Sequence, residues 1–98
     1  MTYAKPEERK SLIVGLRCFA DFLERNPEVP SPRRADVLVF PPATSDKEAL
    51  EEIDTIASLV GAQIEDCTAS HGHYTASRYF GPVQYRAVAI LTNRRHDP

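Results

Sequence analysis

Two stretches of the chain repeat apolar residues at the spacing of an amphipathic helix. In residues 6–25 the repeat runs at intervals of four, three and four positions, through Leu12, Leu16, Phe19 and Leu23. Pro6 favours the start of a helix, because the N–H that it lacks would have no partner in the first turn. Asn26 precedes Pro27 and is therefore disfavoured in the helical conformation. We expect a helix over residues 6–25 whose apolar stripe is buried.

The second repeat lies in residues 46–60 and consists of Ala49, Ile53, Ile56 and Val60. Just before it, Ser45 and Glu48 stand three positions apart, as in a capping box. In that motif each side chain accepts a hydrogen bond from the backbone N–H of the other residue. Gly61 suits the left-handed conformation that ends many helices. We expect a helix over residues 46–60.

Shorter apolar runs predict four β-strands. Residues 36–40 place valines on one side and Leu38 and Phe40 on the other. Because both sides are apolar, we expect this strand inside the sheet and not at an edge. Residues 62–69 predict a second strand. Residues 73–80 and 83–91 are rich in tyrosine, valine and threonine, and predict a β-hairpin across Gly81 and Pro82.

The predicted order of elements is therefore α-β-α-β-β-β. A chain of 98 residues has room for one hydrophobic core, so we expect a single domain, 1–98, with residues 1–5 and 93–98 flexible. The first two strands are joined through a helix and would be parallel if they are neighbours. Two helices cannot cover both faces of four strands. The sequence thus predicts a two-layer α+β sandwich, with both helices on one face of a mixed, mostly antiparallel sheet.

The register of the hairpin decides which side chains lie on the face without helices. A two-residue loop pairs Ala76 with Ala87, and puts small residues at the centre of the face that receives a helix. The alternate residues point to the other face, which we call the open face. The candidate binding residues on the open face carry hydrogen-bonding, cationic or aromatic groups: His73, Ser77, Tyr79, Gln84 and Arg86.

Two kinds of partner suit such a face. A protein, including a second copy of this chain, would use Tyr79 and Arg86 as anchors. A single-stranded nucleic acid would stack a base on Tyr79 and bring a phosphate to Arg86. The net charge is −2, without a broad basic field, and one tyrosine is a small stacking platform. We therefore favour a protein partner over a nucleic acid. A third interpretation is that the face binds no partner and contacts only water.

Candidate chemistry is confined to one loop, where Cys67, His71 and His73 form a C-x3-H-x-H run. Thiolate and imidazole are zinc ligands, and a thiol beside a histidine is a candidate nucleophile. No fourth ligand, oxyanion hole or orienting acid is evident, so a polar loop is favoured and no cofactor is expected. Cys18 is expected to be buried among apolar neighbours. These features favour a protein that is not an enzyme.

Three segments carry a resemblance to a known group of proteins. They are residues 16–27 (LRCFADFLERNP), 54–59 (DTIASL) and 79–89 (YFGPVQYRAVA). In them the chain resembles a group of small actinobacterial proteins of unknown function, often found in phages and other mobile elements. The shared residues belong to packing and turn motifs. The resemblance therefore implies a bacterial setting and transfers no catalytic residue.

The sequence finally bears on location and role. No apolar run approaches 18 residues, and the first positions lack the apolar core of a signal peptide. We expect a cytoplasmic protein without membrane contact. The leading prediction is a non-enzymatic interaction or regulatory module that binds a protein or itself. The first alternative is a nucleic-acid-binding regulator that uses the open face. The second is a metal- or thiol-dependent enzyme that uses Cys67, His71 and His73.

Overall fold

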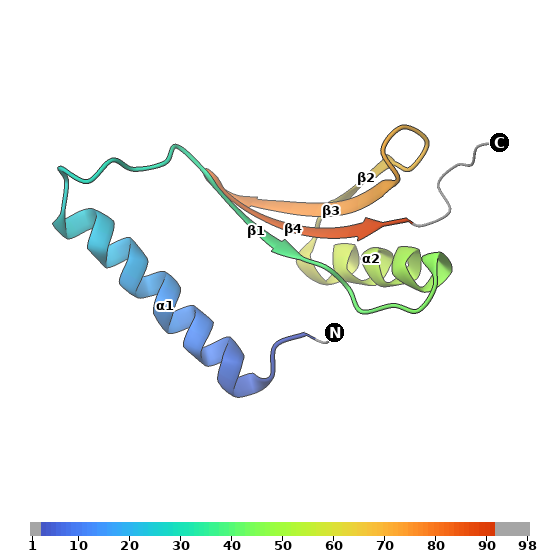
Figure 1. The fold of residues 1–98 in the computed structure, drawn as a ribbon, viewed down its shortest axis with the longest axis horizontal. Helices are drawn as coiled ribbons and strands as arrows, with labels where there is room; N and C mark the ends of the chain where they lie inside the picture. Colours follow the sequence, from blue (N-terminus) through green and yellow to red (C-terminus); the bar gives the residue numbers. More distant parts are fainter. Residues whose placement is uncertain (1–2, 92–98) are drawn as a thin grey trace. The chain divides into compact units, whose positions relative to one another are not determined.

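The structure is a computed structural model that describes residues 3–91 (Figure 1). Its elements follow the predicted order: α1 (Pro6–Arg25), β1 (Ala35–Val39), α2 (Asp46–Val60), β2 (Gln63–Cys67), β3 (His73–Phe80) and β4 (Val83–Ile90). The chain divides into two compact units, Met1–Arg33 and Arg34–Pro98. We describe each unit by itself. The flexibility predicted for residues 1–2 and 93–98 concerns positions outside the described residues.

The first unit is built around α1. Its helix begins after Lys5, whose backbone N–H donates to Oε1 of Glu8 at 2.8 Å. It ends where the backbone N–H and the Nδ2 of Asn26 both donate to the carbonyl oxygen of Phe22, at 3.0 and 2.8 Å. None of the twenty residues of α1 is buried. The predicted helix is confirmed, whereas the predicted burial of its stripe is not found, and Cys18 is exposed.

The second unit contains α2 and the whole sheet. Ser45 caps the helix, because its Oγ accepts from the backbone N–H of Glu48 at 3.2 Å. The carboxylate of Glu48 turns to the backbone N–H of Thr44 at 2.8 Å, one residue before the partner that the capping box predicts. Gly61 ends the helix with a φ of 68°, the left-handed conformation that glycine adopts without strain.

The four strands lie in the order β1-β4-β3-β2. β1 pairs with β4 in parallel, and the other two pairings are antiparallel. The fold class, a mixed four-stranded sheet in an α+β sandwich, is confirmed. The prediction that the first strand lies inside the sheet is wrong, because β1 is an edge strand. β1 and β2 lie at opposite edges of the sheet. The parallel pairing that we expected if they were neighbours therefore does not form.

α2 covers one face of this sheet, as Figure 1 shows. The core lies between them and consists of Ile53, Ile56 and Ala57 of the helix against Ala76, Ala87, Ala89 and Leu91. Ala76 pairs with Ala87 as predicted, and both are fully buried, since small residues let the helix approach closely. The predicted place of the first helix on the same face stays a prediction.

Two polar contacts fix α2 along the sheet. The hydroxyl of Tyr74 on β3 donates to Oδ1 of Asp54 at 2.7 Å. Near the end of the helix, Nη1 of Arg78 donates to the carbonyl oxygen of Val60 at 2.9 Å. Both donors come from β3 side chains on the helix-covered face, so the other face keeps its own set of polar groups. No helix within residues 3–91 is long and apolar enough to cross a membrane.

Candidate functional site: the open face of the sheet

The open face is the side of the sheet away from α2. Because side chains alternate along a strand, the register assigns its members row by row. One row runs from Asp36 through Gln84 to Tyr79, and the next from Leu38 through Arg86 to Ser77. All five candidate residues from the sequence belong to this face: His73, Ser77, Tyr79, Gln84 and Arg86.

The open face has a buried centre and an exposed apolar rim. At the centre, Gln84 is 2% exposed and Thr75 and Val88 are also buried. At the rim, Leu38, Tyr79 and Ile90 are each at least half exposed. A large apolar side chain left in water at several neighbouring positions is typical of a contact surface. The arrangement therefore resembles an interface more than an evenly solvated sheet.

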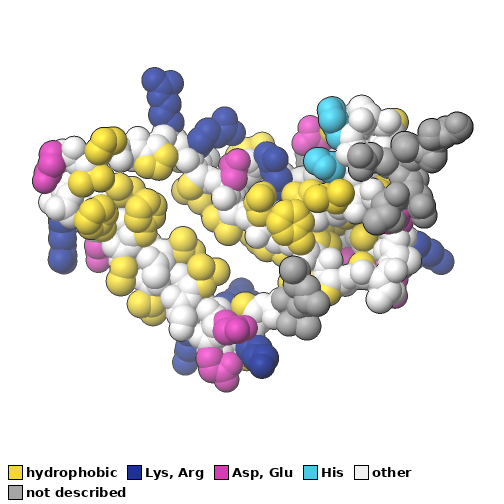
Figure 2. All heavy atoms as spheres, viewed as in Figure 1, with side chains coloured by type: hydrophobic (Ala, Val, Ile, Leu, Met, Phe, Trp, Pro, Cys, Tyr) yellow, Lys and Arg dark blue, Asp and Glu magenta, His cyan; other side chains and the backbone are white. Residues whose placement is uncertain are grey.

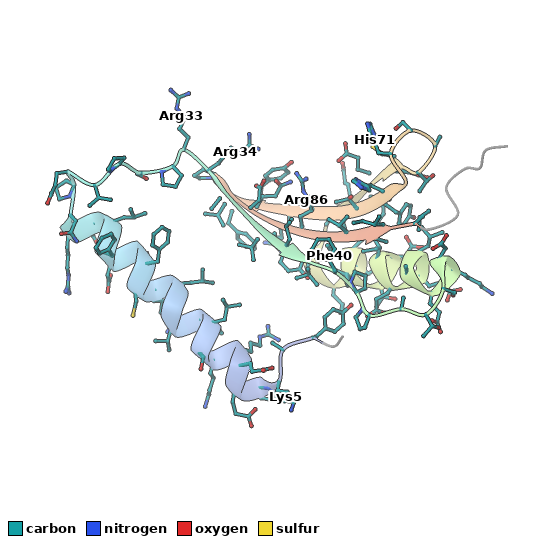
Figure 3. All side chains as sticks on the ribbon, viewed as in Figure 1. Lys5, Arg33, Arg34, Phe40, His71 and Arg86 are labelled. Carbon is teal, nitrogen blue, oxygen red and sulfur yellow. The ribbon has the colours of Figure 1, made fainter. Side chains whose placement is uncertain are left out.

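Arg86 stands near the centre of the open face. Figure 3 labels its side chain on the sheet. Its Nη2 donates to Oε1 of Gln84 at 3.0 Å, so the neighbouring amide fixes the guanidinium. Its Nε is buried and has no hydrogen-bond partner among residues 3–91. A buried donor without an acceptor costs roughly 1–3 kcal/mol, and the guanidinium binds carboxylates through paired N–H groups. Arg86 is half-buried, and its buried Nε leaves one donor of the guanidinium unsatisfied near the centre of the open face.

Beside this centre, the end of β4 borders a shallow hollow of about 250 Å³. Phe40, which follows β1, lines it together with Val88 and Ile90, and the loop before α2 and the start of α2 form the rest of its wall. Phe40 is 43% exposed, so its ring is available to a partner. The hollow adds an aromatic group to a rim that otherwise consists of aliphatic side chains and Tyr79.

The sequence reasoning missed the contribution of β1 to this face. It placed the strand inside the sheet with both sides covered, whereas Leu38 lies at the edge and is 50% exposed. Asp36, in the same strand, pairs with Gln84 and brings a carboxylate to the row that contains Tyr79. The signal was present in the alternation of residues 36–40. It could not be used without knowing that β1 pairs with β4.

The structure places Cys67 and His73 of the predicted metal or thiol loop opposite each other on neighbouring strands, with His71 in the turn between them. Cys67 is paired with His73 across β2 and β3, and the backbone N–H of His71 donates to the Cys67 carbonyl oxygen at 2.8 Å. The Nδ1 of His71 instead lies 2.9 Å from the hydroxyl of Ser70, and the two imidazole rings are 6.4 Å apart. Within residues 3–91 no group of three or more His, Cys, Asp or Glu side chains could hold a metal ion.

The acidic residue of this loop also has a structural partner. Oδ1 of Asp66 accepts from the hydroxyl and the backbone N–H of Thr68, at 2.7 and 3.0 Å. These hydrogen bonds stabilise the charged form and hold the pKa of Asp66 below its ordinary value. A carboxylate with a lowered pKa is a poor proton donor near neutral pH. Asp66 therefore shapes the turn after β2 and does not suit general acid catalysis.

Comparison with known proteins adds no family to this description. No family model matches the chain. No curated protein and no solved structure is significantly similar to it. The resemblance to small actinobacterial proteins stays a prediction, and any function must be argued from the residues of the open face and of α1.

Proposed function

We propose that this protein is a non-enzymatic interaction module that binds another protein through the open face of its sheet. The observation that carries the proposal is Arg86, whose buried Nε lacks an acceptor at the centre of an exposed apolar rim. Arginine surrounded by aromatic and aliphatic side chains is the composition of an energetically important interface centre. An interface there would cover the rim, and a carboxylate of the partner would pair with the charge of the half-buried guanidinium.

The same residues indicate the chemistry of the partner. It presents an apolar surface to Leu38, Tyr79 and Ile90, with a carboxylate at the position that reaches Arg86. Asp36 and Glu65 lie on the same face by register, so a second acidic group placed off-centre would be repelled. The open face therefore selects a partner with one central acidic residue among apolar ones.

The nucleic-acid alternative uses the same face in a different way. Tyr79 is 63% exposed and could stack a base, and Arg86 could contact a phosphate. The acidic side chains of Asp36 and Glu65 oppose a phosphate backbone, which favours a protein partner. Binding of a single-stranded oligonucleotide that weakens with salt and with Tyr79→Ala, but not with Leu38→Ala, would favour this alternative instead.

Site-specific photo-crosslinking tests the proposal. A photoreactive amino acid replaces Leu38 on the open face or, as the control, Leu59 on α2, which is 80% exposed. The tagged proteins are expressed in an actinobacterial host, the source that the resemblance implies. We expect a discrete crosslinked product from position 38 and none of that mass from position 59. A product at twice the 11.0 kDa of the chain would identify a second copy as the partner.

Arg86 variants then decide whether the product depends on the proposed contact. Arg86→Glu should abolish the crosslink from position 38, because it places a negative charge opposite the partner's carboxylate. Arg86→Lys should retain part of it, since a single ammonium keeps the charge and loses the paired geometry. Equal products from positions 38 and 59, or a product unaffected by Arg86→Glu, would contradict the proposal.

A further inference from the structure

The stripe of α1 is the largest apolar surface of the first unit. Figure 2 shows hydrophobic side chains along the length of the helix. Five large apolar side chains of the stripe are between 39% and 53% exposed: Leu12, Ile13, Leu16, Phe19 and Phe22. A single helix of twenty residues is only marginally stable in water, and its stability in proteins comes from covering such a stripe. Something outside this unit must provide the cover.

We propose that a second copy of this chain covers the stripe, and that the two α1 helices pair antiparallel across a two-fold axis. The core positions are spaced by four, three and four residues, an order that reads the same in both directions. An axis between Arg17 and Cys18 therefore sets Leu12 against Leu23 of the second copy. It also sets Leu16 against Phe19, so every core layer contains two large apolar side chains.

The residues beside the core favour the antiparallel arrangement over the parallel one. In the antiparallel pair, Phe22 meets Gly15 of the second copy on one side, and Ile13 meets Ala20 on the other. Each flank thus combines a large side chain with a small one. A Cβ built on Gly15 has no atom within 4 Å, so the space for the phenylalanine ring is open. A parallel pair would set Gly15 against Ala20 of the second copy, two small residues that leave a gap, and would set Phe22 against position 27, beyond the end of α1.

The area suits a weak dimer. With roughly 100 Å² for each of the five half-exposed large side chains, the stripe offers about 500 Å² per helix, or about 1,000 Å² for the pair. Specific stable interfaces bury roughly 1,200–2,000 Å² in total, and weak ones bury less. The dimer lies just below the range of the stable interfaces. We therefore expect a reversible equilibrium between monomer and dimer, which dilution can shift.

Exchanging the large and small flank residues tests the contact. Gly15→Phe should weaken dimerisation at least tenfold in sedimentation experiments, because the new ring meets Phe22 of the second copy. Phe22→Ala should weaken it similarly by leaving a gap. The double variant restores one large and one small residue at each flank, and should recover affinity to within about threefold of the original.

The control for these variants is Val14→Ala. Val14 is 56% exposed and lies on the side of α1 opposite the stripe, so this change should leave the dimer unaffected. Each single variant favours or preserves helix formation, so a loss of dimer cannot be attributed to a less stable helix. A double variant as weak as the single ones, or a dimer abolished by Arg86→Glu and not by Gly15→Phe, would overturn the proposal.

Orientation is tested by a spin label. Cys18 and Cys67 are free thiols and are replaced by serine, and a label is attached through Glu7→Cys. In the antiparallel dimer the two labels are separated by 21 helical positions along the axis, or about 30 Å. In a parallel dimer they are separated by little more than the distance of about 10 Å between helix axes. A short distance, or a chain that remains monomeric at high concentration, would contradict the inference.

Discussion

The two helices have similar patterns and opposite environments. Both repeat apolar residues at helical spacing, and α2 buries Ile53, Ile56 and Ala57 against the sheet. α1 is longer and carries more large apolar side chains, yet buries none of its residues. The comparison shows that an amphipathic pattern specifies a helix, and that the apolar side chains of this helix need another surface to pack against. It does not specify whether the cover comes from the same unit, from the other unit of the chain or from another molecule.

The same contrast separates the two faces of the sheet. The face against α2 has alanines at its centre, at Ala76, Ala87 and Ala89. The open face has Arg86 near its centre and large side chains at its rim. Small residues suit a permanent neighbour that packs closely, whereas an arginine with an unpaired Nε suits a partner that arrives later. We therefore expect substitutions to affect stability on covered surfaces and association on uncovered ones.

The largest expected effect comes from truncating equivalent positions in the two helices. Ile53→Ala should lower the free energy of unfolding by about 2–5 kcal/mol, because it leaves a cavity in the core. Leu16→Ala in α1 should change it by less than about 0.5 kcal/mol in dilute solution, because no residue of α1 is buried. Urea unfolding at low protein concentration measures both. Equal losses would show that the two helices do not differ in the way described.

Enlarging a small residue gives the next effect. Ala87→Leu should destabilise the protein by about 1–3 kcal/mol, because Ala87 is fully buried beneath α2. Ala20→Leu makes the same change on exposed α1, and should leave the unfolding midpoint of the dilute protein unchanged. Thermal unfolding followed by circular dichroism compares the two variants. A tolerated Ala87→Leu would contradict the close approach of α2 to the sheet.

The variant Arg86→Met distinguishes a role of Arg86 in the stability of the fold from a role in binding a partner at the open face. Methionine retains a long side chain and removes the unpaired Nε, but it also takes the donor from Oε1 of the buried Gln84. Because these two effects oppose each other, the free energy of unfolding should change by no more than about 1 kcal/mol. The same variant should lose the crosslink from position 38. If it instead destabilised the protein by more than about 1 kcal/mol, Arg86 would be a structural residue and the proposed function would lose its main support.

The smallest expected effect is a dependence on alkaline pH. The hydrogen bond from Tyr74 to Asp54 raises the pKa of the tyrosine above its ordinary value of 10.0, with burial and the carboxylate charge adding to it. The folded state then holds this proton more tightly than the unfolded state. Its contribution to stability is complete below pH 10.0 and is lost as the pH rises through the raised pKa.

We expect this loss to stay below about 1 kcal/mol, because the hydrogen bond is close to solvent. Tyr74→Phe should abolish it, whereas Tyr79→Phe on the open face should not. Urea unfolding at neutral pH and above pH 10.0 checks the difference between these variants. An alkaline loss of stability that persisted in Tyr74→Phe would assign the dependence to another group.

Much of the fold could be predicted from local patterns. The helices, the Ser45 cap and the pairing of Ala76 with Ala87 follow from spacing and turn chemistry over a few residues. The position of β1 could not be predicted in this way, because its partner β4 lies more than forty residues further along the chain. Alternation shows that a strand has two apolar faces, but not which of them a neighbour covers.

The residues of the candidate site likewise divide into those that the local sequence predicts and those that only long-range strand pairing brings in. Tyr79, Gln84 and Arg86 come from one hairpin, and its register places them on one face, as predicted. Leu38 and Asp36 join them only through the parallel pairing of β1 with β4. The unpaired Nε of Arg86 is invisible in a sequence, since it depends on side-chain positions around a buried atom. The sequence could thus suggest the face but not the unpaired donor on which the proposed function rests.

Hydrogen exchange measured as a function of protein concentration tests the central claim most directly. Amides in α2 should be protected equally at all concentrations, because the sheet of the same chain covers this helix. Amides in α1 should exchange rapidly at about 1 μM and become protected towards about 100 μM, as second copies cover the stripe. Protection of α1 that is already complete at the lowest concentration, or absent at the highest, would contradict the account.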